Sequence, residues 1–143
     1  MKKIVIIGAG YAGVLTAQHL AKKLENTSDV RITLIDKNNY HTMRTEIHAA
    51  ATGRGKANSI IYDLKDLFKK TSVNLVFDTA IDIDFTGKKV VAVMTHEGSG
   101  LGSCERDLKK ICAGATFGKG LAVHGADASR SENTVATWAK SVI

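Results

Sequence analysis

The sequence predicts an α/β fold built on a parallel β-sheet. Two short apolar segments, residues 3–7 and 31–35, flank a segment whose apolar residues recur at helical spacing, and this strand, helix, strand order is that of a βαβ unit. The 143 residues allow one domain of ordinary size. A hydrophobic fraction of 44% and a charged fraction of 24% are those of a globular chain that buries a core, which excludes a disordered or fibrous protein.

The first βαβ unit follows from its residue types. Residues 3–7 (K-I-V-I-I) are rich in β-branched side chains and end at a glycine, which predicts a strand buried on both faces. The spacing of apolar residues from Tyr11 onward predicts an amphipathic helix that ends near Asn26. Residues 31–35 (R-I-T-L-I) predict a second strand, parallel to the first.

Three further elements are predicted after the βαβ unit. Residues 43–52 have a helix-compatible composition, and Gly53 would end that helix. Asp63 is suited to cap the N-terminus of a short helix. Residues 73–77 (V-N-L-V-F) predict the third strand of the sheet.

A β-hairpin is predicted after the third strand. Residues 80–85 (A-I-D-I-D-F) alternate strictly, residues 86–88 (T-G-K) are a turn signal, and residues 89–94 (K-V-V-A-V-M) read as another strand. Residues 111–115 (I-C-A-G-A) are small and apolar, and they predict a short strand that returns to the main sheet.

A glycine-rich motif lies between the first strand and the first helix. Residues 8–13 (G-A-G-Y-A-G) match the dinucleotide-binding pattern GxGxxG in the position where it functions. Gly8 permits a tight turn, Gly10 lets a pyrophosphate approach the backbone, and Gly13 lets the helix pack close to the strand. The phosphates would then meet free N–H groups at the positive end of the helix dipole.

An acidic residue stands where such a motif requires one. Asp36 follows the second strand and lies 23 residues after Gly13, near the roughly 20-residue spacing of a carboxylate that binds a ribose. The alternative is a solvated aspartate beside an ordinary glycine-rich turn. Lys37 either contacts the adenosine or is solvated. Strand, loop, helix and acid together predict a Rossmann-like dinucleotide-binding domain.

Three segments resemble one family. They are K-I-V-I-I-G-A-G-Y-A-G (residues 3–13), N-Y-H-T-M-R-T-E-I-H-A-A-A-T-G (residues 39–53) and V-N-L-V-F-D-T-A-I-D-I-D-F-T-G-K-K-V (residues 73–90). Together they resemble the N-terminal part of type II NADH dehydrogenases, which are FAD-dependent pyridine nucleotide oxidoreductases. The resemblance extends over residues 1–95. It implies a Rossmann-like FAD-binding domain with a parallel sheet and a β-meander, incomplete in this chain.

The same resemblance implies FAD as the bound cofactor and assigns residues to it. The implied contacts are Gly8, Ala9, Gly10, Tyr11, Ala12 and Gly13 at the pyrophosphate, Asp36 and Lys37 at the ribose, Ala80 at the adenine, and Thr45 and Ala113 near the flavin. Glu46 and His48 also match the family pattern, and either they lie near the flavin or they serve only the local fold. Neither catalytic residues nor metal ligands are expected in this chain, because the cofactor carries the chemistry.

The resemblance also implies a domain organisation. Residues 1–143 would form the N-terminal portion of an FAD/NAD(P)-binding Rossmann-like domain, and residues 96–143 would lead to an NADH domain that this chain lacks. One departure stands out, because Lys109 and Lys110 fall where the family has two consecutive core-strand residues. Either that strand is an exposed edge or the region packs differently.

In the family, hydride passes from NADH to FAD and then to a quinone at the membrane. The complete protein would therefore have NADH and quinone as partners and would be cytoplasmic, peripheral to the inner face of the cell membrane through C-terminal segments absent here. The family's disulfide reductases have a reactive cysteine in the segment that reads Y-H-T-M-R-T here (residues 40–45), so a disulfide mechanism is not expected. Cys104 is expected in a loop and Cys112 as a buried, inert thiol in a strand. The sequence leaves the oligomeric state open.

Charge and hydropathy exclude other classes. The net charge of +6 arises within residues 1–72, which hold 12 basic and 6 acidic residues, and it favours a mildly basic surface over an anionic partner. Nucleic acid is not an expected partner, because the basic residues are scattered among acids and aromatic residues make up 6%. No apolar run approaches the roughly 18 residues of a membrane span, which is why a cytoplasmic protein is expected.

Two other functions remain open at this point. One is a non-catalytic dinucleotide-binding module or fragment that binds FAD or ADP without turnover. The other is a small NAD-dependent enzyme that uses the same loop, against which the predicted hairpin argues, since a dehydrogenase would place a crossover helix there.

Overall fold

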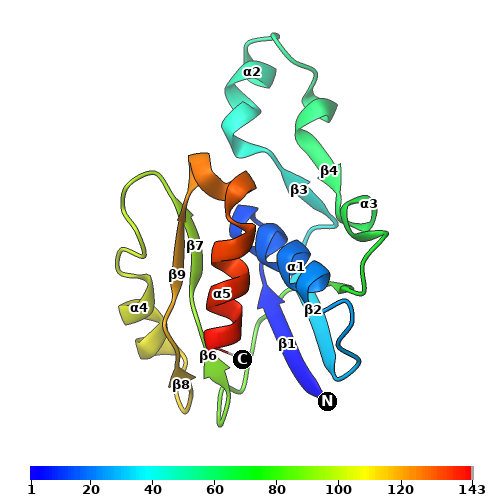
Figure 1. Ribbon diagram of the computed structural model, residues 1–143. Helices are drawn as coiled ribbons and strands as arrows, with labels where there is room; N and C mark the ends of the chain where they lie inside the picture. The colour runs from blue at the N-terminus through cyan, green and yellow to red at the C-terminus, as the bar shows by residue number, and fades with distance from the viewer. Residues whose placement is uncertain (143) are drawn as a thin grey trace. The chain divides into compact units, whose positions relative to one another are not determined.

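The structure is a computed structural model that describes residues 1–142, with the side chains of all of these except residues 57 and 58. The chain divides into two compact units, Met1–Ala80 and Ile81–Ile143, and their elements are shown in Figure 1.

The first unit contains a parallel sheet and a smaller antiparallel pair of strands. Its strands are β1 (Lys2–Ile7), β2 (Val30–Asp36), β3 (Tyr40–Thr42), β4 (Ile61–Asp63) and β5 (Asn74–Phe77). Its helices are α1 (Tyr11–Lys23), α2 (Ile47–Ala51) and α3 (Leu64–Phe68), with 3-10 turns η1 (Arg44–Glu46) and η2 (Ala57–Ile60).

The predicted βαβ unit and its parallel sheet are confirmed. The strand order is β1-β2-β5, with Ile6 opposite Leu34 and Asp36 opposite Phe77, and all pairs are parallel. Helix α1 crosses from β1 to β2 and packs on the sheet (Figure 1). The core between them and α3 is formed by six buried apolar residues, namely Ala9, Val14, Ala17, Leu34, Leu64 and Phe68. This core holds the β1–α1 loop in a fixed place at the carboxyl end of the sheet.

The prediction that the first strand is buried on both faces is wrong. Val5 and Ile7 point away from the α1 side and are 55% and 53% exposed. The physical reason is that α1 covers only the face of the sheet that carries Ile4 and Ile6.

The segment after β2 differs in detail from the prediction. The helix expected over residues 43–52 forms as η1 followed by α2, and Gly53 ends it with φ +72°. β3 precedes this helical segment and β4 follows it. The two strands pair antiparallel, and this pairing was not predicted from the sequence. Asp63 caps α3 as predicted, because its Oδ1 accepts the Lys65 N–H at 2.7 Å.

The second unit is also mixed α/β. Its strands are β6 (Lys89–Val90), β7 (Val93–His96), β8 (Thr116–Phe117) and β9 (Leu121–His124). Its helices are α4 (Cys104–Ile111), the 3-10 segment η3 (Gly125–Arg130) and α5 (Glu132–Val142). β6 pairs with β8 and β7 pairs with β9, both in parallel, and α4 lies in the connection. Val135 and Ala139 form the buried side of α5.

The predicted hairpin, and with it the β-meander, is wrong. Residues 80–85, all of them described, form no strand, and Ile81 is 91% exposed. The turn does form, with Gly87 at φ +68°, and the Thr86 N–H, at 2.9 Å from Asp84 Oδ1, lowers the pKa of that carboxyl. The segment after the turn pairs in parallel with β8 and β9 instead. Strict alternation predicts an extended segment, but it does not identify the partner strand.

The predicted strand at residues 111–115 is also wrong. Helix α4 runs to Ile111, Cys112 is its C-terminal cap, and Gly114 turns the chain with φ +79°. Cys104 begins this helix and does not lie in a loop. Lys109 and Lys110 lie exposed in the last turn, where the helix dipole favours cations, so no lysine is buried in a strand.

Candidate functional site

The glycine-rich loop joins β1 to α1 in an open turn. Gly8 has φ +97°, a conformation that disfavours every residue with a Cβ, and its N–H donates to the Ile35 carbonyl at 2.8 Å. Gly10 is extended and is the N-terminal cap residue of α1. The turn therefore leaves the carboxyl edge of the sheet and enters the helix as the motif predicts.

The other two glycines have opposite surroundings. A Cβ built on Gly10 has no described heavy atom within 4 Å, so this part of the backbone is open to a ligand. A Cβ on Gly13 would overlap the carbonyl oxygen of Gly8. The tight packing predicted at Gly13 is confirmed, and the approach of a pyrophosphate at Gly10 stays a prediction that the open space fits.

Helix α1 presents free backbone donors at this loop. Its first helical hydrogen bond runs from the Val14 N–H to the Gly10 carbonyl at 2.9 Å, so the N–H groups of the three preceding residues have no acceptor within the described helix. The first turn of the described α1 holds no acidic residue, and its last turn carries Lys22 and Lys23. These donors and the helix dipole fit a bound pyrophosphate.

Asp36, at the end of β2, connects the sheet to the glycine-rich loop through a hydrogen bond. Its Oδ2 accepts the Ala9 N–H at 2.6 Å and its Oδ1 accepts the Asn38 N–H at 2.8 Å. A carboxylate has about four acceptor sites, so both oxygens keep capacity for ribose hydroxyls. That Asp36 binds the ribose stays a prediction. The hydrogen bond from the Ala9 N–H to Asp36 was not predicted from the sequence.

His41 is a part of the site that the sequence analysis missed. This side chain on β3 is 7% exposed, and its Nδ1 lies 2.9 Å from the Ala9 carbonyl oxygen. Its ring meets the Tyr11 ring edge-on, with centroids 4.9 Å apart. A three-residue strand has too short a pattern to place a histidine, and its inward direction depends on the pairing of β3 with β4.

Most of the predicted cofactor contacts of the first unit lie near this loop. The Tyr11 hydroxyl lies 3.1 Å from Thr45 Oγ1 in η1, which joins the loop to that segment. Lys37 is exposed next to Asp36, and Ala80 is exposed after the end of β5, the strand beside β2. Glu46 and His48 are exposed as well.

Ala113 belongs to the second unit. It lies exposed in the turn after α4, so the strand expected to carry it is absent from the described structure and its contact with the flavin stays a prediction. Within residues 1–142, no three His, Cys, Asp or Glu side chains form a group that could hold a metal ion.

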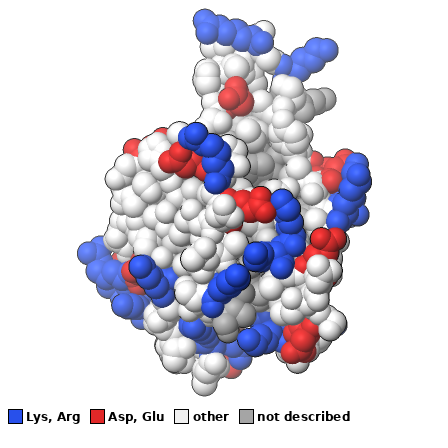
Figure 2. All heavy atoms as spheres, viewed as in Figure 1, with Lys and Arg blue, Asp and Glu red and all other residues white. Residues whose placement is uncertain are grey.

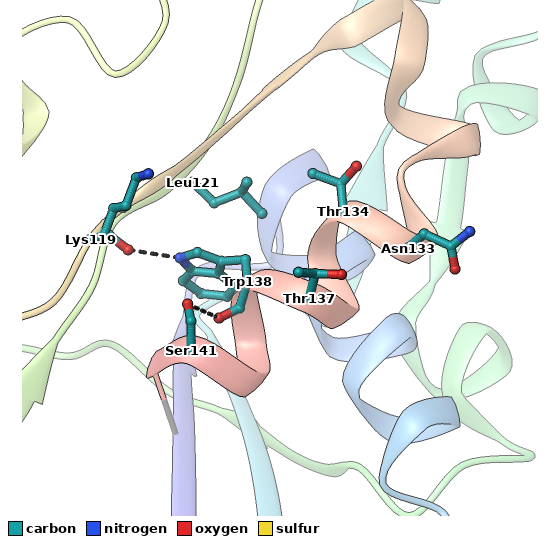
Figure 3. A pocket seen from close by; sticks show the side chains of 8 residues that line it. Lys119, Leu121, Asn133, Thr134, Thr137, Trp138 and Ser141 are labelled. Carbon is teal, nitrogen blue, oxygen red and sulfur yellow. Dashed lines mark hydrogen bonds between the residues drawn. The ribbon is translucent and has the colours of Figure 1, made fainter.

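A separate pocket lies in the second unit between β9 and α5 (Figure 3). Its volume is about 550 Å³, and the Trp138 Nε1–H at its wall donates to the Lys119 carbonyl at 2.7 Å. The other lining residues are Gly120, Leu121, Asn133, Thr134, Thr137 and Ser141. None of them belongs to the predicted cofactor site.

On the face that Figure 2 shows, Lys and Arg side chains lie among Asp and Glu side chains. This agrees with the prediction of a mixed, mildly basic surface. No helix in the described part of the chain is long and apolar enough to cross a bilayer.

By sequence, this chain is similar to type II NADH:quinone oxidoreductases. Type II NADH:quinone oxidoreductases of Staphylococcus aureus strains COL and MW2 are 39% identical over 89 residues, which is 62% of this chain and 22% of each relative. The matched part thus spans about a fifth of the length of these curated relatives.

The sulfide:quinone oxidoreductase of Aquifex aeolicus has a TM-score of 0.52 at 17% identity, covering 100% of this chain and 50% of that one, and it shares the fold. The structure of NDH2 from Plasmodium falciparum in complex with NADH has a TM-score of 0.44 at 20% identity, covering 53% and 15%.

A family profile matches the chain as well. The profile described as pyridine nucleotide-disulphide oxidoreductase matches residues 2–115, which include the glycine-rich loop, Asp36 and the second unit as far as the turn after α4. This chain therefore belongs to the pyridine nucleotide-disulphide oxidoreductase family, whose members are FAD-binding flavoproteins.

Proposed function

We propose that this chain is the FAD-binding portion of an NADH dehydrogenase-like flavoprotein. The observation that carries the proposal is the β1–α1 loop, where Gly10 is open, the first-turn N–H groups of α1 lack helical acceptors, and Asp36 lies beside them. Family membership and the relatives named type II NADH:quinone oxidoreductase support FAD as the nucleotide.

Different residues of this chain would bind different parts of FAD. The loop of residues 8–13 would hold the pyrophosphate through the N–H groups of Gly10 and of the first turn of α1, because the Gly8 and Ala9 N–H groups already have acceptors. Asp36 would accept hydrogen bonds from the ribose with Lys37 beside it, and the backbone of Ala80 would meet the adenine. Thr45 and Ala113 would lie near the flavin. When bound, FAD supplies the capacity to accept a hydride and pass electrons on.

The complete protein would oxidise NADH and reduce a quinone. The names of the Staphylococcus aureus relatives support this, and these relatives are far longer than the matched part of this chain. We propose that residues 96–143 lead toward the NADH domain and that the complete protein is cytoplasmic and meets the membrane peripherally. The isolated chain would bind the cofactor without an NADH site of its own.

The test uses the purified chain and its visible spectrum, followed by identification of any nucleotide released on denaturation. The expected result is a bound flavin, or uptake of FAD on titration, released as FAD. A chain that carries no flavin and takes up none would overturn the proposal.

The same geometry would also serve a module that binds FAD or ADP without turnover. The short share of the relatives' length that the chain matches favours this second function for the isolated chain. NADH:quinone turnover measured with the isolated, flavin-loaded chain would exclude it.

A further inference from the structure

We propose that His41 is a positioning residue. It holds the phosphate-binding loop in its binding conformation and so raises the affinity for the pyrophosphate of FAD without touching it. This inference rests on the proposed function. His41 lies on β3, a strand outside the βαβ unit, and reaches the loop from a distance of 32 residues along the chain.

The first step is the direction of the hydrogen bond. A carbonyl oxygen can only accept, so the 2.9 Å contact between His41 Nδ1 and the Ala9 oxygen requires the proton on Nδ1. His41 is therefore the donor, with a proton on Nδ1. The ring is buried and set edge-on against Tyr11, which limits its rotation.

The second step is the geometry of the peptide group. The Ala9 carbonyl and the Gly10 N–H belong to one planar, trans peptide, so they point in opposite directions. With the oxygen turned inward to His41, the Gly10 N–H points outward, to the open side on which a Cβ of Gly10 would have no described neighbour within 4 Å. His41 thus holds a pyrophosphate donor in place before the ligand arrives.

The third step is that the preceding peptide is fixed as well. The Ala9 N–H donates to Asp36 Oδ2 at 2.6 Å. Both polar groups of Ala9 are therefore held inside the protein, one by β2 and one by β3. A ligand that meets a loop already held in its binding conformation avoids the entropy cost of ordering it.

Two variants separate this role from mere core packing. His41→Asn keeps a potential N–H donor bonded to Cγ, where Nδ1 is bonded in histidine, whereas His41→Leu fills a similar space with no donor. The binding constants of FAD and of ADP, which shares the pyrophosphate but lacks the flavin, are measured by calorimetry on the full chain. The folded fraction of each variant is measured under the same conditions and used to correct the binding constants.

We expect His41→Leu to weaken FAD and ADP binding in parallel, by about tenfold, and His41→Asn to bind within about threefold of the original chain. Unchanged ADP binding by folded His41→Leu would overturn the proposal, and so would equal losses in both variants or a loss for FAD alone. If the original chain binds neither nucleotide, the proposed function itself fails.

A measurement on the unaltered chain covers the case in which a variant does not fold. Long-range ¹H–¹⁵N NMR correlations of the His41 ring report its tautomer. The proposal requires the proton on Nδ1, and an Nε2–H tautomer with a bare Nδ1 would overturn it, because two acceptors would then face each other.

Discussion

Gly10, the N-terminal cap of α1, and Gly13, in its first turn, stand three residues apart, and alanine at each should have a different effect. The Cβ of Gly13→Ala would overlap the Gly8 carbonyl, so α1 must move from β1, and we expect a loss of about 2–3 kcal/mol in the free energy of unfolding. Urea unfolding of the purified variant measures this loss.

Gly10→Ala is the matched control, because its Cβ enters open space at a φ of −70° that alanine adopts freely. Its stability should stay within about 0.5 kcal/mol of the original, while its affinity for FAD falls, since the methyl group stands where a phosphate would approach. Equal stability of the two variants would contradict the packing assigned to Gly13.

Asp36 is predicted to contribute to stability as well as to binding. Asp36→Ala leaves the Ala9 and Asn38 N–H groups without their acceptor, and each unmade hydrogen bond in a partly buried place costs about 1–3 kcal/mol. Asp36→Asn keeps one acceptor oxygen and should fall between the original chain and Asp36→Ala. Thermal unfolding of the three proteins gives the order, and an Asp36→Ala variant as stable as the original would show that these contacts contribute nothing.

At the scale of elements, α4 is stabilised by the order of its charges. Glu105 and Asp107 lie in its first turn and Lys109 and Lys110 in its last, which suits the helix dipole at both ends. The family pattern has a strand here, and Lys109 and Lys110 left open whether it would be an exposed edge strand or the region would pack differently. The helix bears out the second alternative. The charge order was the local signal for a helix, and it outweighs a resemblance that extends only to residue 95.

The two thiols of α4 should differ in reactivity. Cys112 caps the helix and is 4% exposed, whereas Cys104 in the first turn is half-buried. With a thiol reagent such as DTNB, we expect Cys104 to react first and Cys112 to react only as the second unit unfolds. The Cys104→Ser variant isolates the second thiol, and fast labelling of that variant under native conditions would contradict the burial of Cys112.

The sequence predicts an element when the interactions that form it lie within a few residues of one another. The β1–α1–β2 unit, the cap at Asp63, the tight turn at Gly8 and the close packing at Gly13 were predicted correctly, because turn, cap and periodicity arise within a few residues. The pairing of β3 with β4, and of β7 with β9, joins segments about 20–30 residues apart, and such partners leave no local pattern. His41 was missed for the same reason, since only the β3–β4 pairing turns it inward.

At the scale of the whole chain, the two units meet in sequence at a segment without regular structure. Residues 79–88 form no helix or strand in the described structure, and the Ile81 side chain is almost fully exposed. Such a segment is the preferred place for proteolytic cleavage. Thermolysin, which cleaves before large apolar residues, should therefore cut first at Ile81 or Ile83.

Mass spectrometry of the early fragments identifies the first cut. Ile81→Asp with Ile83→Asp removes both sites and should slow the first cleavage, while the remaining apolar sites are unchanged. A first cut within β1, α1 or β2 would show that the first unit is less stable than its buried core indicates.

The central claim is that the β1–α1 loop binds the pyrophosphate of FAD. The most direct measurement is a calorimetric titration of the full chain with FAD, repeated in the presence of ADP and compared with NADH. The account predicts one FAD per chain, competition by ADP, weaker binding of NADH than of FAD, and loss of affinity in Gly10→Ala. A chain that binds neither FAD nor ADP, or that binds NADH more tightly than FAD, would contradict it.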